Sequence, residues 1–133
     1  MAIKTYKPIL IDSIIAETDF EKQRLIGFDG NYCKKGAKAL GVSDVEIEKG
    51  QYAPVAISGI LLVVTGGKIN KGDIITSDDI GRAISASSGT INEVDDGDDS
   101  TRLYSFSSGD EINGYALDSA SAEGEVIRIV RGV

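Results

Sequence analysis

The feature that most limits the fold of this chain is a series of short apolar runs, rich in Ile and Val, separated by glycine turns. This composition is typical of strands, and the dipeptides Asp-Gly, Lys-Gly and Gly-Gly between the runs mark tight turns. No segment sustains the 3.6-residue periodicity of a longer helix. We therefore expect short antiparallel strands at 24–28, 53–58, 59–64, 73–76, 81–85 and 125–130.

One segment, 18–25, has the start signal of a helix. Thr18 and Glu21 have the spacing of a capping box, in which each side chain bonds the backbone amide of the other residue. The sequence predicts one or two helical turns there at most.

The chain also contains an internal repeat. Residues 41–59 (GVSDVEIEKGQYAPVAISG) and 114–132 (GYALDSASAEGEVIRIVRG) share one order: glycine, a small-residue strand, an acidic stretch, a turn glycine and an apolar strand. Two copies cannot form a solenoid array. We predict an all-β fold, a small barrel or sandwich of short antiparallel strands built from two similar halves.

Two segments fall outside these halves. Residues 1–17 include the apolar sequence PILIDSII and predict an extended N-terminal arm that either completes the domain's own sheet or docks on another chain. Residues 18–133 predict a single β domain, with an acidic insertion at about 86–111 that has the composition of an exposed loop.

Charge and cysteine content limit the partners. The balance of 14 Lys and Arg against 21 Asp and Glu gives a net charge of −7, which repels nucleic acid. Cys33 is the single cysteine, so no internal disulfide forms. Pro8 and Asp12 interrupt the N-terminal apolar run, which argues against a signal peptide, and no run approaches the roughly 20 residues of a membrane helix. We expect neither a nucleic-acid nor a membrane partner.

The segment 66–85 (GGKINKGDIITSDDIGRAIS) has residue types that hold phosphate or metal ions. Its Lys68 is followed by Ile69, where a P-loop needs Ser or Thr. Its aspartates, and those of EVDDGDD at 93–99, lack the alternating register of a calcium-binding EF-hand. We interpret GGKINKGD (66–73) as two β-turns that flank Ile69 and lead into a strand at DIIT, and predict no metal and no cofactor. The aspartates of the segment 66–85 that lack this calcium-binding register are Asp73, Asp78 and Asp79.

Catalytic groups are also scarce. The chain has no histidine, which removes the commonest general base and the commonest zinc ligand. A Ser-Lys dyad or a carboxylate pair stays open, and Cys33 has Lys34 beside it, although an incidental or buried thiol is the favoured interpretation. Of the aromatic residues, only Tyr104 and Phe106 suggest a carbohydrate platform. We predict no catalytic residue and no enzyme.

Taken in order, these features resemble the capsid decoration, or cement, proteins of tailed bacteriophages. The resemblance runs through IIAETDFEKQRLIGFDGNYC (14–33), the long stretch from AKALGVS to DDIGRAI (37–84) and INGYALDSASAEGEVIRIV (112–130). The order of elements around 66–84 is its most specific part. The first dozen residues and the acidic insertion have no counterpart in the resemblance.

The resemblance implies a structural virion protein without catalysis. Such a protein is made in the host cytoplasm, binds the exterior of the assembled capsid and bridges neighbouring subunits of the major capsid protein, as a homotrimer. The apolar arm is not part of the resemblance, and we assign it capsid or inter-subunit contacts from its residues alone. These residues are Tyr6, Ile9, Leu10, Ile11, Ile14 and Ile15.

Three alternatives stay open. A lipoyl- or biotinyl-type carrier barrel is one, because GGKINKGDII resembles the carrier hairpin and offers Lys68 and Lys71. Another phage structural module, such as a head fibre or a tail adhesion domain, is the second. A small enzyme that uses a serine or Cys33 is the third.

Overall fold

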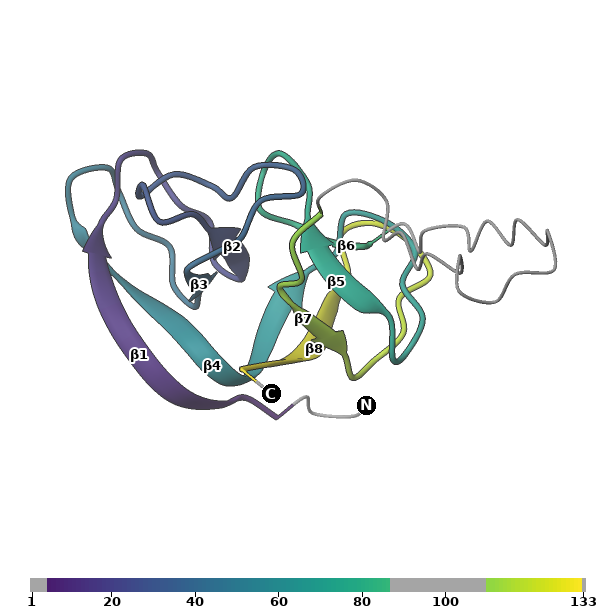
Figure 1. Cartoon of the computed structure of the whole chain (residues 1–133). Helices are drawn as coiled ribbons and strands as arrows, with labels where there is room; N and C mark the ends of the chain where they lie inside the picture. The colour runs from purple at the N-terminus through teal and green to yellow at the C-terminus, as the bar shows by residue number, and fades with distance from the viewer. Residues whose placement is uncertain (1–4, 87–109, 133) are drawn as a thin grey trace, which may run out of the picture.

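The computed structural model describes residues 5–86 and 110–132, and in these ranges it contains strands and no helix (Figure 1). A helix long and apolar enough to cross a membrane is accordingly absent from the described ranges. The strands are β1 (Lys7–Ile15), β2 (Arg24–Ile26), β3 (Gly41–Ser43), β4 (Tyr52–Val64), β5 (Ile74–Ser77), β6 (Ala83–Ser85), β7 (Gly114–Ala116) and β8 (Val126–Arg131). The predicted all-β class is confirmed, and the expected strands at 53–58 and 59–64 are one continuous strand, β4.

The helix predicted at 18–25 is wrong. Gln23 has a φ of 64°, a left-handed conformation that a helix cannot include. Phe20 instead exchanges backbone hydrogen bonds with Ile47, and the segment ends in β2, whose Leu25 and Ile26 are fully buried. Long-range strand pairing therefore overrides the local capping signal.

The sheet is organised on β4, which uses both of its edges. Val55 and Ala56 pair with β1 and also with β3, while Gly59 and Ile60 pair with β1 and also with β8. Because a strand has only two edges, β3 and β8 follow one another along one edge, and β1 occupies the other. The long strand β4 thereby joins three parts of the chain in one sheet (Figure 1).

The residues predicted as an arm lie along this sheet. The strand β1 pairs antiparallel with β4, from Lys7 opposite Ile60 to Ile15 opposite Tyr52. Of the two places that the sequence leaves open for these residues, the structure shows the one that completes the domain's own sheet. No described residue pairs with the outer edge of β1.

The two halves of the sequence repeat follow one pairing pattern. The strands β2, β3 and β4 pair in that order, and β5, β7 and β8 pair in the same order, which gives the sheet the order β2-β3-β4-β8-β7-β5-β6. An isolated bridge precedes the first strand of each half. The corresponding pairs are Phe20↔Ile47 with Ile69↔Ala120, Leu25↔Val42 with Ile74↔Tyr115, and Ile26↔Gly41 with Ile75↔Gly114.

The sheet nearly closes into a barrel. A parallel bridge between Thr65 and Ala83 brings β6 back to the end of β4. The closed side encloses the larger apolar core, and a smaller cluster lies on the inner side of β1. The larger core includes Leu25, Val42, Leu61, Val63, Ile75, Ile127 and Ile129, and the smaller consists of Ala16, Phe20, Ile26 and Ala53.

We expect Gly59→Ala to separate β1 from β4. A β-carbon at this position would clash with the carbonyl oxygen of Lys7 and lie 2.8 Å from the amide nitrogen of Ile9, and its φ of +113° disfavours other residues. The free energy of unfolding should fall by about 3 kcal/mol or more in urea denaturation, because a clash adds to the backbone strain.

Gly124→Ala is the matched control. Gly124 also has a positive φ, +84°, but no atom lies within 4 Å of its added β-carbon. It should lose only the conformational cost of about 1 to 2 kcal/mol. Equal losses in the two variants would show that the close approach of β1 is not the constraint at Gly59.

Candidate docking surfaces

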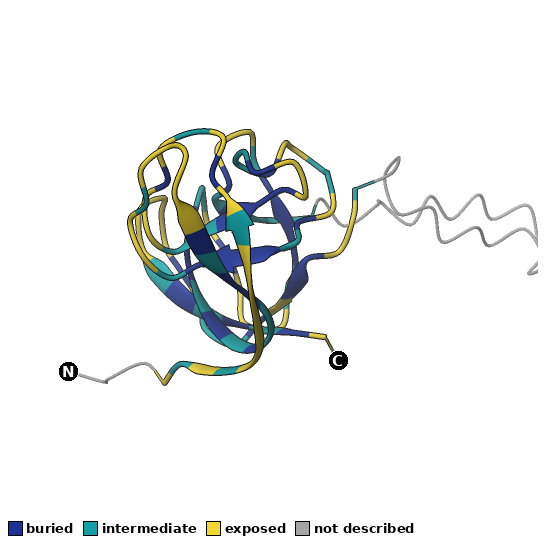
Figure 2. Cartoon of the chain, turned by 90° about the vertical axis from the view of Figure 1, so that its left-hand side faces the viewer, coloured by how far each residue is buried: buried dark blue, intermediate teal, exposed yellow. Residues whose placement is uncertain are grey.

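The structure divides the six predicted contact residues into two groups. Tyr6 and Ile14 are partly buried, and they pack against the larger and the smaller core cluster respectively. The other four are exposed, with Ile9 the most exposed at 84%. Figure 2 faces this side and shows most of β1 in the colours of exposed and half-buried residues. The exposed four are Ile9, Leu10, Ile11 and Ile15.

Tyr52 belongs to the same surface, and sequence reasoning missed it. It lies directly opposite Ile15 in the β1–β4 pairing and is 70% exposed. Residues opposite one another in an antiparallel pair point to the same face, so the two side chains lie side by side. Only the register of β1 on β4 places them together. We call Ile9, Leu10, Ile11, Ile15 and Tyr52 the β1 surface.

The outer edge of β1 carries features that hinder the addition of another strand. Pro8 has no backbone N–H to donate, and the register with β4 shifts between Pro8 and Ile11. The amide of Ser13 donates to the Asp12 carboxylate at 2.8 Å, within the strand itself. Proline, bulges and charge are the usual means by which proteins protect such an edge. The β1 surface is thus suited to contact through its side chains.

Tyr6, just before β1, connects this strand to Asp44 and to the larger core. Its hydroxyl donates to Oδ2 of Asp44 at 2.9 Å. Partial burial and then the hydrogen bond to Asp44 raise the pKa of Tyr6 to about 12. The other carboxylate oxygen of Asp44, Oδ1, is buried without a hydrogen-bond partner. The Tyr6 hydroxyl therefore stabilises a carboxylate that has few other donors.

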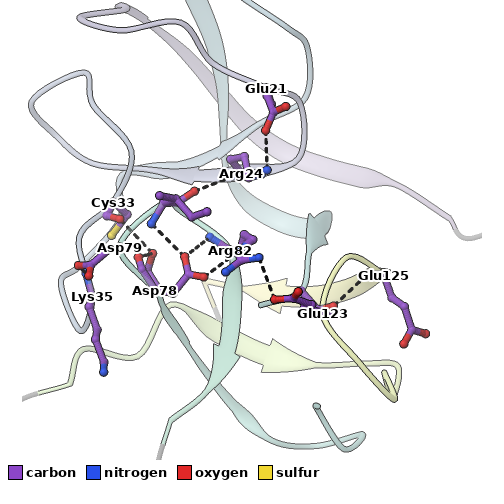
Figure 3. Close-up of polar contacts among 12 residues, drawn as sticks. Glu21, Arg24, Cys33, Lys35, Asp78, Asp79, Arg82, Glu123 and Glu125 are labelled. Atoms are coloured by element: carbon purple, nitrogen blue, oxygen red, sulfur yellow. Dashed lines mark hydrogen bonds and ion pairs between the residues drawn. The ribbon is translucent and has the colours of Figure 1, made fainter. Parts of the chain in front are cut away.

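The aspartates of 66–85 hold turns. Asp78 accepts hydrogen bonds from the amides of Ile80 and Arg82 at 3.0 and 2.8 Å, and forms an ion pair with the Arg82 guanidinium at 2.7 Å (Figure 3). Asp73 accepts a bond from the amide of Asn70 at 2.9 Å. These contacts confirm the interpretation of the segment as β-turns.

This turn also joins the two halves. The Gly81 carbonyl accepts the amide of Leu25 at 2.7 Å, and the Ile80 carbonyl accepts the Arg24 guanidinium at 2.9 Å. Asp79 accepts the amide of Lys35 at 3.2 Å (Figure 3). The segment that has the composition of a ligand site is thus the seam between the halves.

The remaining candidates from the sequence are the thiol of Cys33, the acidic clusters and one aromatic pair. Cys33 is buried, desolvation raises the pKa of its thiol, and its Sγ lies 3.3 Å from the Ala37 carbonyl oxygen. A reactive thiol needs the opposite, an environment that favours the thiolate. Among the described residues no three acidic or cysteine side chains form a metal-binding group. The aspartates of 93–99, Tyr104 and Phe106 lie outside the described residues.

A comparison with protein families assigns the chain. The profile of the phage cement proteins matches residues 4–131, nearly the whole sequence. The chain belongs to the phage cement protein family. It is a capsid-associated structural protein, as the resemblance in the sequence implies. A comparison with curated proteins found no match.

A solved structure supports the fold of this cement protein. The cement protein is similar to the crystal structure of the head fiber gp8.5 N base of bacteriophage phi29. The TM-score is 0.61, and the two chains share 20% sequence identity, with 92% of this chain and 93% of that one covered. At this identity the likeness shows the fold alone. The absence of catalytic activity stays a prediction.

We expect Tyr6 of the cement protein to titrate late. Its side chain should ionise near pH 12 in the folded chain, which the ultraviolet absorbance of tyrosinate measures. The pKa is 10.0 in the unfolded chain, so the stabilisation from this group is complete below pH 10 and is lost as the pH rises to 12.

Tyr6→Phe removes this titration and the donor to Asp44 together. We expect its free energy of unfolding near neutral pH to be lower by about 1 to 3 kcal/mol, because a buried acceptor loses its partner. Tyr115→Phe, at an exposed position, is the control. A late titration that persists in Tyr6→Phe would contradict the assignment.

Proposed function

We propose that this cement protein binds the exterior of the assembled phage capsid and stabilises it by bridging neighbouring subunits of the major capsid protein. The observation that carries the proposal is the β1 surface, where five large apolar side chains are exposed on one strand and its neighbour. Clustered exposed apolar residues of this kind mark interaction sites. Burial of each isoleucine contributes up to about 1.5 to 3 kcal/mol to binding.

Bridging stabilises a shell by mass action. A protein that binds only the assembled lattice lowers the free energy of that state relative to separated subunits. We propose that the protein acts as a homotrimer, because three linked contacts raise the overall affinity without stronger single contacts. The net charge of −7 suits a position outside the shell, away from packaged DNA. The proposal requires no catalysis, no nucleic acid and no membrane.

The double variant Ile9→Ser/Ile11→Ser tests the β1 surface. Both side chains are exposed, so the fold should persist while the apolar contact is lost. We expect its affinity for purified heads that lack this protein to fall about tenfold or more, measured by co-sedimentation. Wild-type protein should also raise the temperature at which such heads break.

Phe28→Ser is the control, because Phe28 is 69% exposed but lies outside β1. It should bind heads like the wild type. Loss of binding in Phe28→Ser but not in the double variant would move the contact away from β1. A wild-type protein that ignores its own assembled heads would refute the proposed function, and electron microscopy of decorated heads would give the symmetry of the bound protein.

A further inference from the structure

A groove beside the bend of β4 has two cationic side chains and exposed apolar ones. Its volume is about 410 Å³, and it lies between the end of β8, β7 and the middle of β4. Figure 1 shows these strands meeting near the C-terminus. Lys38 and Arg131 line it, with no carboxylate among the described lining residues. A groove whose charged lining residues are all cations is unusual on a chain of net charge −7.

The backbone that carries Lys38 is held on both sides. The Asn113 amide group donates to the Ala37 carbonyl at 2.9 Å and accepts the Ala39 amide at 2.8 Å. The Arg131 guanidinium donates to the carbonyls of Ala39 and Leu40. Asn113 and Arg131 are themselves buried, so Lys38 projects from a fixed segment. This is the preorganisation that a binding site needs.

The charge of Arg131 has no anionic partner in the described structure. Only 9% of the residue is exposed, and its guanidinium donates to two backbone carbonyls. Desolvation lowers the pKa of its guanidinium, since burial disfavours the cation. The Lys38 ammonium contacts the Ile112 carbonyl at 2.5 Å and retains further donors. A carboxylate placed in the groove would pair with the exposed Lys38 ammonium and lie beside the buried charge of Arg131.

The groove is continuous with the β1 surface. Ser58, which lines the groove, lies opposite Leu10 in the β1–β4 pairing. On its other side the groove presents Ile112 and Tyr115, which are both exposed. A partner that covers the β1 surface therefore reaches the cationic groove with the same face.

We propose that the groove binds an acidic side chain flanked by apolar residues on the major capsid protein. This proposal rests on the proposed function and adds the chemistry that the capsid must present. The carboxylate pairs with the Lys38 ammonium beside the buried charge of Arg131, and its apolar neighbours pack on Ile112 and Tyr115. The β1 surface supplies apolar contact, while the groove supplies charge selectivity and orientation.

Lys38→Glu tests the groove, because Arg131 is needed for the fold. We expect its affinity for purified heads to fall about tenfold or more, and this loss to shrink at high ionic strength. Lys38→Arg retains the charge and should bind within about threefold of the wild type. Lys35→Glu makes the same charge change on an exposed residue outside the groove, and should bind within about twofold. The thermal unfolding temperature of each variant is measured to show whether the fold is intact.

The outcomes separate the two proposals. If Lys38→Glu binds heads as well as Lys35→Glu does, while Ile9→Ser/Ile11→Ser does not bind, the groove proposal fails and the proposed function stands. If wild-type protein binds no heads, both fail. If Lys38→Glu instead disrupts self-association in sedimentation without heads, the occupant is a second copy and the proposal is overturned. The acidic end formed by Asp19, Glu21, Glu46 and Glu48 would then be its natural counterpart.

Discussion

The rest of the structure depends on the pairing of β4 along both of its edges. The strand has 13 residues, about twice the usual length, and it changes partners near Gly59. Its far half is apolar on both faces because Leu61 and Val63 enter the core while Ile60 and Leu62 are half-buried on the outside. The strands β1, β3 and β8 pair directly with β4, and β2 and β7 each pair with one of these neighbours. Only β5 and β6 lie further from β4 in the order of the sheet.

The seam at 66–85 shows why glycine and aspartate clusters are weak signals of a ligand site. A turn needs residues that tolerate positive φ and side chains that satisfy its free amides, and these are the residues that a phosphate or metal site also needs. Here Asp78 bonds two amides of its own turn, and Gly81 has a φ of +74° and approaches Leu25 of the other half. The hydrogen-bonding groups of this segment are thus used to hold the chain's own backbone.

Much of the fold was predictable from the sequence, because strand composition, turn glycines and an internal repeat are local signals. The register was not. Tyr52 joins the β1 surface, and Lys38 joins Arg131, only through pairings between distant segments. The false helix at 18–25 has the same origin, since the Phe20 to Ile47 bridge is invisible to a capping pattern. The apolar character of PILIDSII (8–15) is visible in the sequence, but the place of this segment on β4 depends on a glycine at 59.

The position of β8 in the sheet has a consequence for biosynthesis. Although β8 comes last among the strands, it lies between β4 and β7, and Arg131 at its end holds the backbone of Ala39 and Leu40. Neither half can complete its hydrogen bonding until residue 131 has left the ribosome. A nascent or truncated chain thus exposes an unfinished sheet to proteases and chaperones.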